Sequence, residues 1–171
     1  MPITLPALLP IDRLTLVQMS EASPGSLLIK SAGYGGEPFL AFRDANDPEP
    51  RTYVLPFEGD DRYRFHIADA VGNSGHWLAI DSWQLLVDPA SAFMSTRESP
   101  EVGDAFVSAG APGFVGRWNH AEAYISVAGA VLEQPAWTSS FVGYRSWAIC
   151  IDLGTPWKPH ILLDRSRPPR T

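Results

Sequence analysis

The residues of this chain that could do chemistry are four histidines, one cysteine and scattered acidic side chains. The histidines are His66, His76, His120 and His160, and the cysteine is Cys150. No two histidines have the close spacing of a metal-binding strand, and a zinc site of four cysteines is impossible with a single cysteine. We therefore expect ordinary surface or hydrogen-bonded histidines, no metal and no cofactor. A site assembled from distant strands stays open as an alternative.

Cys150 could act as a nucleophile, with His120 or His160 as its base. It lies in the run Trp147 to Leu153, where Trp, Ile, Ile and Leu recur at every second position and favour a strand with one apolar face. A cysteine inside such a strand is normally buried, and an apolar environment keeps its thiol protonated. We expect Cys150 to be buried and unreactive.

Three loops match known sites only in part. Gly72 to Gly75 resembles the serine loop of trypsin-like proteases, but that family places its histidine far upstream, whereas His66 is the first histidine here. We predict a hairpin turn instead. His120-Ala121-Glu122 resembles half of the zinc deaminase signature, whose other half needs two cysteines. Asp44 to Pro50 is rich in oxygen donors but lacks the EF-hand spacing, so we predict a solvated turn.

Composition limits the class of protein. The chain has 171 residues, 45% of them hydrophobic, and a net charge of −6. These values suit a globular domain and argue against nucleic acid or an anionic membrane as a partner. Residues 1–10 are apolar but contain three prolines and no basic start, so we expect neither a signal peptide nor a spanning helix. A single cysteine weakly favours a reducing, cytoplasmic location.

The 16 prolines and 14 glycines cut the chain into short pieces rich in β-branched and aromatic residues. The clearest strand is Arg62–Ala68, with Tyr63, Phe65 and Ile67 toward a core. Ala90–Glu98 suits a helical turn or a loop. Further candidate strands are Leu14–Met19, Ser26–Ser31, Pro38–Arg43, Thr52–Phe57, His76–Asp81, Gln84–Asp88, Ala105–Ala109, Gly113–Trp118, Ala121–Val127 and Pro159–Asp164.

About a dozen short strands predict an all-β fold, a single-domain β-sandwich or barrel. We expect one domain over residues 1–164 and a basic, proline-containing flexible tail over 165–171. A weak internal echo links Leu14–Leu16 to Tyr63–Phe65, each followed by a second apolar run. This spacing resembles that of the β-trefoil lectins and protease inhibitors and implies a trefoil as the alternative fold. No third copy is visible, and two unrelated hairpins would look the same.

The stretch from residue 118 to residue 127 alternates sharply between two faces. Trp118, His120, Glu122 and Tyr124 share one face, opposite a run of small and branched apolar residues. Aromatic rings beside hydrogen-bonding groups suit a surface that binds sugar or protein. We therefore predict that these four residues bind a partner, with an ordinary solvent face as the alternative.

No segment has the spacing of a catalytic motif. The leading hypothesis is a non-enzymatic binding module for a protein or carbohydrate, including an inhibitor-like protein. A second hypothesis is a small metal-dependent or acid–base enzyme in a β-barrel, using some of His66, His76, His120, Glu122 and Asp81. A third is a structural subunit of a symmetric assembly whose exposed aromatics are subunit contacts.

Overall fold

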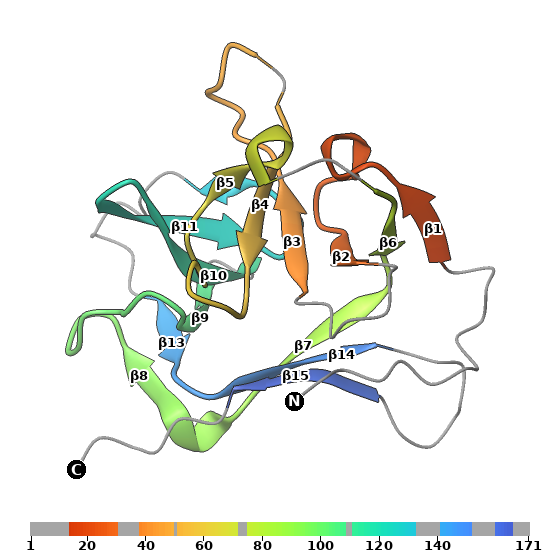
Figure 1. The fold of residues 1–171 in the computed structure, drawn as a ribbon. Helices are drawn as coiled ribbons and strands as arrows, with labels where there is room; N and C mark the ends of the chain where they lie inside the picture. The colour runs from red at the N-terminus through yellow and green to blue at the C-terminus, as the bar shows by residue number, and fades with distance from the viewer. Residues whose placement is uncertain are drawn as a thin grey trace.

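The structure, a computed structural model, describes seven stretches of the chain, and 54% of their residues lie in β-structure (Figure 1). These stretches are residues 14–30, 38–49, 51–71, 75–108, 111–132, 141–151 and 160–165. They also contain the short 3-10 helices η2 (Met19–Glu21), η3 (Ala68–Val71) and η4 (Pro89–Ser91). The predicted all-β fold is confirmed, whereas barrel and trefoil stay predictions. No helix in these stretches is both long and apolar enough to cross a bilayer.

The first sheet is antiparallel and has the strand order β1-β6-β2-β3-β4-β5. Its strands β3 and β4 are buried at every position, because apolar side chains cover both faces. Phe42 faces the main core, whereas Phe39 packs against Trp77 on the other face, with ring centroids 5.3 Å apart. The six strands are β1 (Leu14–Val17), β2 (Leu27–Lys30), β3 (Phe39–Phe42), β4 (Tyr53–Pro56), β5 (His66–Ile67) and β6 (Trp77–Ile80).

A second six-stranded sheet has the order β12-β11-β10-β9-β13-β8, and a third has the order β15-β14-β7. The backbone of Ser146 accepts a hydrogen bond from Asp88, and Ser91 accepts one from Arg145. These bonds continue the pairing of β7 with β14 into that of β8 with β13. The strands are β7 (Trp83–Val87), β8 (Ala92–Met94), β9 (Ala105–Ser108), β10 (Ala111–Trp118), β11 (Ala121–Ser126), β12 (Val131–Leu132), β13 (Val142–Tyr144), β14 (Trp147–Ile151) and β15 (His160–Arg165).

Two parallel bridges join the first sheet to the second, and they position the surfaces considered below. Arg64 pairs with Arg117, supported by a 2.9 Å hydrogen bond from Phe65 N to Arg117 O and a 2.7 Å bond from Arg117 N to Tyr63 O. Arg43 pairs with Ala130 in the same way. The β10–β11 hairpin therefore lies against the segment that precedes β5, far away in sequence (Figure 1).

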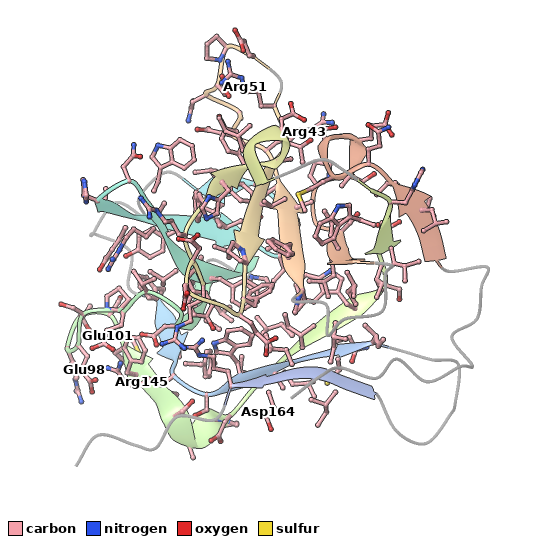
Figure 2. All side chains as sticks on the ribbon, in the orientation of Figure 1. Arg43, Arg51, Glu98, Glu101, Arg145 and Asp164 are labelled. Atoms are coloured by element: carbon pink, nitrogen blue, oxygen red, sulfur yellow. The ribbon has the colours of Figure 1, made fainter. Side chains whose placement is uncertain are left out.

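The main core gathers aromatic rings from all three sheets and the loops between them (Figure 2). Phe57, Phe114 and Trp147 pack mutually, with ring centroids 4.9–5.6 Å apart. The indole N–H of Trp147 donates to the carbonyl of Gly103 at 2.9 Å, so the one polar atom of this buried ring is satisfied. Such edge-to-face packing stabilises each ring pair by about 0.5–1.5 kcal/mol beyond area burial.

Several expected elements differ from the structure. Within Arg62–Ala68 only β5 is a strand, although Tyr63 and Phe65 are buried as predicted. Tyr63 has a φ of 61°, because the chain turns through residues 60–63 before it reaches the bridge to Arg117. Ala90–Glu98 contains part of the expected helical turn, because Ala90 and Ser91 belong to η4, but residues 92–94 form strand β8. The predicted hairpin turn at residues 72–75 lies outside the described residues except for its last residue.

The two segments of the internal echo, Leu14–Leu16 and Tyr63–Phe65, do not have equivalent structures. Leu14–Leu16 is regular strand in β1, paired with β6, whereas Tyr63–Phe65 contains a left-handed residue and only a bridge. The predicted tail also begins too early, because Arg165 is the last residue of β15. Residues 166–171 lie outside the described residues.

The expected burial of Cys150 is confirmed, since 1% of the residue is exposed. Burial, and then the charge of Asp164, raises the pKa of its thiol. A raised pKa leaves less thiolate at neutral pH, and thiolate is the reactive form. We therefore expect a thiol reagent at neutral pH to label the native chain at least about tenfold more slowly than the chain unfolded in denaturant. Equal rates would mean that the thiol is accessible and would restore Cys150 as a candidate nucleophile.

Candidate binding site

The four residues predicted to bind a partner lie on the β10–β11 hairpin but do not share one face. Trp118 ends β10 and is 37% exposed, and His120 is exposed in the two-residue turn that follows. Glu122 is exposed on β11, whereas Tyr124 is only 1% exposed. The prediction of one shared, exposed face is therefore wrong. Tyr124 is buried on the same face of β11 as Glu122, whereas Trp118, the β10 partner of Ala121, lies on the opposite face.

Tyr124 is buried because the base of the hairpin is covered on both faces. Its ring packs against Phe106 and Phe141, with centroids 5.5 and 6.0 Å away, while its neighbour Ile125 enters the main core. Burial raises the pKa of the Tyr124 hydroxyl to about 12. The exposed part of the hairpin runs from Arg117 to Glu122, so a ligand can reach that part but not Tyr124.

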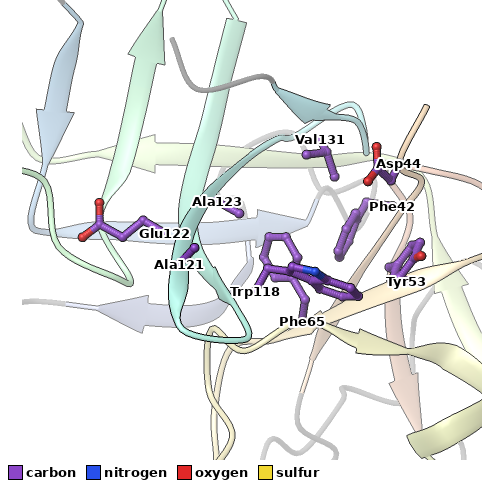
Figure 3. A pocket seen from close by; sticks show the side chains of 9 residues that line it. All are labelled: Phe42, Asp44, Tyr53, Phe65, Trp118, Ala121, Glu122, Ala123 and Val131. Atoms are coloured by element: carbon purple, nitrogen blue, oxygen red, sulfur yellow. The ribbon is translucent and has the colours of Figure 1, made fainter. Parts of the chain in front are cut away.

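Trp118 forms one wall of a hollow that we call the aromatic pocket (Figure 3). The pocket has a volume of about 150 Å³ and is lined mainly by apolar side chains. Both large sheets contribute to the pocket. The first sheet supplies residues of β3 and β4 and the residue preceding β5, and the second supplies residues of β10, β11 and β12. Its lining residues are Phe42, Asp44, Tyr53, Phe65, Trp118, Ala121, Glu122, Ala123 and Val131.

Four rings hold one another in place around the pocket. Trp118 meets Tyr53 edge to face, with centroids 5.2 Å apart, and lies 5.9 Å from Phe65. Phe42 packs against both of these rings, 5.6 Å from Tyr53 and 4.7 Å from Phe65. Phe42, Tyr53 and Phe65 are buried, and Trp118 is the exposed member. The pocket thus has rigid aromatic walls and one ring open to solvent.

The polar groups at the pocket come from the acidic loop between β3 and β4. The Asp44 carboxylate lies at the rim, beside Phe42 (Figure 3). The Tyr53 hydroxyl donates to Asp47, which lowers the pKa of that carboxyl. Burial, together with this bond, raises the pKa of Tyr53 to about 12. Both groups therefore keep their ordinary charge at neutral pH, and the loop brings negative charge to the rim.

The loop conformation over residues 44–49 agrees with the predicted solvated turn. The backbone N–H of Asn46 donates to Asp44 Oδ1 at 2.9 Å, and that of Glu49 donates to Asp47 Oδ1 at 3.0 Å. These side chains therefore stabilise the local turns. Glu122 was expected to supply an acceptor beside Trp118, but its carboxylate points away from the rings (Figure 3). Asp44 takes that place instead.

Sequence reasoning missed three walls of the pocket. Phe42 and Tyr53 were placed in candidate strands, and Phe65 was assigned to the core, without a link to Trp118. Each ring is indeed buried, but it also lines the pocket. A local alternation pattern contains no signal for this, because the strands meet only through the contact between the two large sheets.

The residues of the hypothetical enzyme are not gathered into one centre. His66 Nε2 lies 4.0 Å from an Asp61 carboxylate oxygen, and Asp81 accepts a hydrogen bond from the Ser26 hydroxyl. His120 and Glu122 are exposed on the hairpin. In the described ranges, no three His, Cys, Asp or Glu side chains are arranged to hold a metal ion.

Comparisons with known proteins provide no relative from which a function could be transferred. No family model matches this chain, and neither a curated protein nor a solved structure is significantly similar to it.

Proposed function

We propose that the protein is a non-enzymatic recognition module that binds a protein partner through the aromatic pocket. The observation that carries this proposal is a rigid pocket walled by four rings, in which Trp118 is exposed at the edge. Tryptophan is among the residues that most often dominate the binding energy of interfaces. A monomer gains nothing by leaving such a ring in solvent beside an open apolar hollow.

The size of the pocket favours one side chain over a whole small molecule. Its volume of about 150 Å³ is below the roughly 300–1,000 Å³ of ordinary ligand pockets. A carbohydrate partner is less well supported, because a sugar ring stacks on a broad exposed face and three of the four rings are buried. A protein segment that inserts a single anchor side chain fits the space available.

The charge at the rim favours a lysine or arginine as that anchor. Asp44 lies at the rim and Asp47 is bonded to Tyr53 in the adjoining loop. Aromatic faces attract cations by about 0.5–2 kcal/mol, depending on desolvation. The methylene stem of a lysine or arginine would contact Ala121 and Val131 while its charge approached Asp44. The chain's net charge of −6 would also attract a basic partner.

This proposal is tested by panning a random peptide library against the wild-type protein. We expect the selected peptides to share a lysine or arginine, and Trp118→Ala to weaken their binding by about 1–2 kcal/mol, as for an interface anchor. Asp44→Asn preserves an acceptor for the Asn46 N–H. It should weaken the binding of basic peptides without disturbing the aromatic rings. Binding is measured by calorimetry, and circular dichroism verifies that each variant is folded.

Leu16→Ala is the matched control, because Leu16 is a 59% exposed apolar residue on β1, away from the pocket. We expect it to leave peptide affinity unchanged. Peptides that bind Trp118→Ala as tightly as the wild type would place the binding surface elsewhere. If peptides without a basic residue bind and still require Trp118, the pocket is the binding site but its anchor is not a lysine or arginine.

A further inference from the structure

A second hollow, which we call the arginine groove, lies on the other side of the β10–β11 hairpin tip from the aromatic pocket. Its volume is about 510 Å³, and its lining is mainly polar. Four of the chain's arginines line it, against two aspartates. The lining residues are Asp60, Asp61, Arg62, Tyr63, Arg64, Val102, Arg117, Asn119, His120 and Arg165.

Two of these arginines are neighbours by backbone pairing. Arg64 and Arg117 are partners in the parallel bridge between the first and second sheets. Like charges directly opposite each other destabilise a pair of strands. Among the described residues, the acid that pairs with exposed Arg64 is Asp61, whose oxygen is 3.7 Å away. Glu122 is the β11 residue paired with Arg117. Exposed pairs of this kind compensate repulsion only weakly.

A third arginine of the groove, Arg165, is held in place by contacts with Tyr63. The guanidinium of Arg165 stacks 4.4 Å above the ring of buried Tyr63, and it donates a hydrogen bond to the Tyr63 hydroxyl. Tyr63 itself is held at a φ of 61°, in a conformation that side chains as large as tyrosine rarely adopt. The surrounding structure therefore holds this ring in place, and the ring in turn positions Arg165 toward the groove.

Two of the four arginines, Arg62 and Arg117, leave positive charge available. Within the described parts of the chain, neither Arg62 nor Arg117 has a carboxylate within 4 Å of its guanidinium. His120 adds a ring donor at the same hollow, at the hairpin tip. This concentration of cations stands out in a chain whose net charge is −6.

We propose that the arginine groove binds the phosphate groups of a soluble ligand. Planar guanidinium forks form bidentate, charge-assisted hydrogen bonds to phosphate oxygens. A phosphate between Arg64 and Arg117 would also replace their repulsion with two attractions. The groove has room for more than one phosphate group, so the probe chosen here is pyrophosphate. An anionic bilayer is disfavoured as the source of phosphate, because the net charge of the chain is −6.

Calorimetric titration with pyrophosphate, in chloride buffers of matched ionic strength, tests the proposal. We expect saturable binding at one site per chain, weakened at least about tenfold by Arg64→Gln or Arg117→Gln, since each removes charge-assisted hydrogen bonds. Arg97→Gln is the matched control, because Arg97 is exposed in a turn outside the groove and its loss changes the net charge equally. It should weaken binding by no more than about twofold.

Folding is followed separately, by thermal unfolding in chloride alone. Arg117→Gln should unfold at the same temperature as the wild type or higher, because it removes a like-charge contact. No saturable binding by the wild type, or an equal loss in the Arg97 control, would overturn the proposal. So would binding to phosphatidate-containing vesicles without binding to pyrophosphate. These outcomes leave the proposed function untouched, because the peptide experiment depends on Trp118 and Asp44.

Discussion

Replacing Arg145 with methionine is expected to lower the free energy of unfolding by about 3–5 kcal/mol, the usual cost of breaking a buried ion pair. Arg145 is 7% exposed, and its Nη2 donates to Glu98 at 2.6 Å (Figure 2). Its Nη1 lies 3.6 Å from the carboxylate of Asp104, which is completely buried. Its guanidinium also covers the ring of Phe93, at 4.5 Å. Methionine fills much of the space but removes the cation that faces the buried Asp104 carboxylate.

Two further variants make this prediction specific, with denaturant unfolding as the measurement. Arg51→Met removes an arginine–glutamate pair with Glu49 that is largely exposed, so it should change the free energy of unfolding far less than Arg145→Met. Adding Asp104→Asn to Arg145→Met should recover part of the loss, because the buried charge disappears while an acceptor for the Glu101 N–H remains. Equal costs for Arg145→Met and Arg51→Met would show that the buried cluster does not stabilise the fold.

The second large effect is expected from Gly129→Ala, which should cost about 2–5 kcal/mol by combining left-handed strain with overpacking. Gly129 has a φ of 79° in the turn between β11 and β12. A Cβ there would lie 2.1 Å from Gly25 N and 2.5 Å from the carbonyl carbon of Pro24. Both are backbone atoms of the first sheet's β1–β2 connection, so neither can rotate away. The substitution would push the two large sheets apart.

Two other glycines separate the contributions to this cost. Gly75 has a φ of 133°, but an added Cβ would meet nothing within 4 Å, so Gly75→Ala should cost only about 1–2 kcal/mol of backbone strain. Gly113 has no positive φ, but its Cβ would lie 2.2 Å from Ile125 O, so Gly113→Ala should cost about 1–3 kcal/mol of overpacking. We expect Gly129→Ala to have the lowest unfolding temperature of the three variants. A Gly129→Ala variant as stable as Gly75→Ala would contradict the close contact between the sheets.

The proposed anchor pocket and the phosphate groove share one hairpin. Trp118 belongs to the pocket, whereas Asn119 and His120, the next two residues, line the groove. The segment before β5 is divided in the same way, because Phe65 lines the pocket and Arg64 the groove. Successive side chains of a strand point to opposite faces, which separates Arg64 from Phe65 and Arg117 from Trp118. Asn119 and His120 instead reach the groove from the turn of the hairpin. One structural element can therefore present two chemically different surfaces.

The sequence by itself determined the fold class and several local features. Frequent prolines and glycines prevent long helices, and the β-branched and aromatic runs between them formed most of the expected strands. Cys150 was correctly expected to be buried, because it lies in a strand dominated by large apolar residues. The acidic loop at Asp44 was expected to be a turn because aspartate and asparagine side chains bond to their own backbone, as they do here.

Only the tertiary structure decided which faces are covered and which residues meet. Alternation along β11 shows that Glu122 and Tyr124 point the same way, but not that the sheet covers one and leaves the other in solvent. The pocket unites Tyr53 with Trp118, and the groove unites Arg64 with Arg165, across long separations in sequence. Such contacts depend on how whole sheets pack against each other. Local periodicity carries no information about that packing, because it describes the faces of one strand at a time.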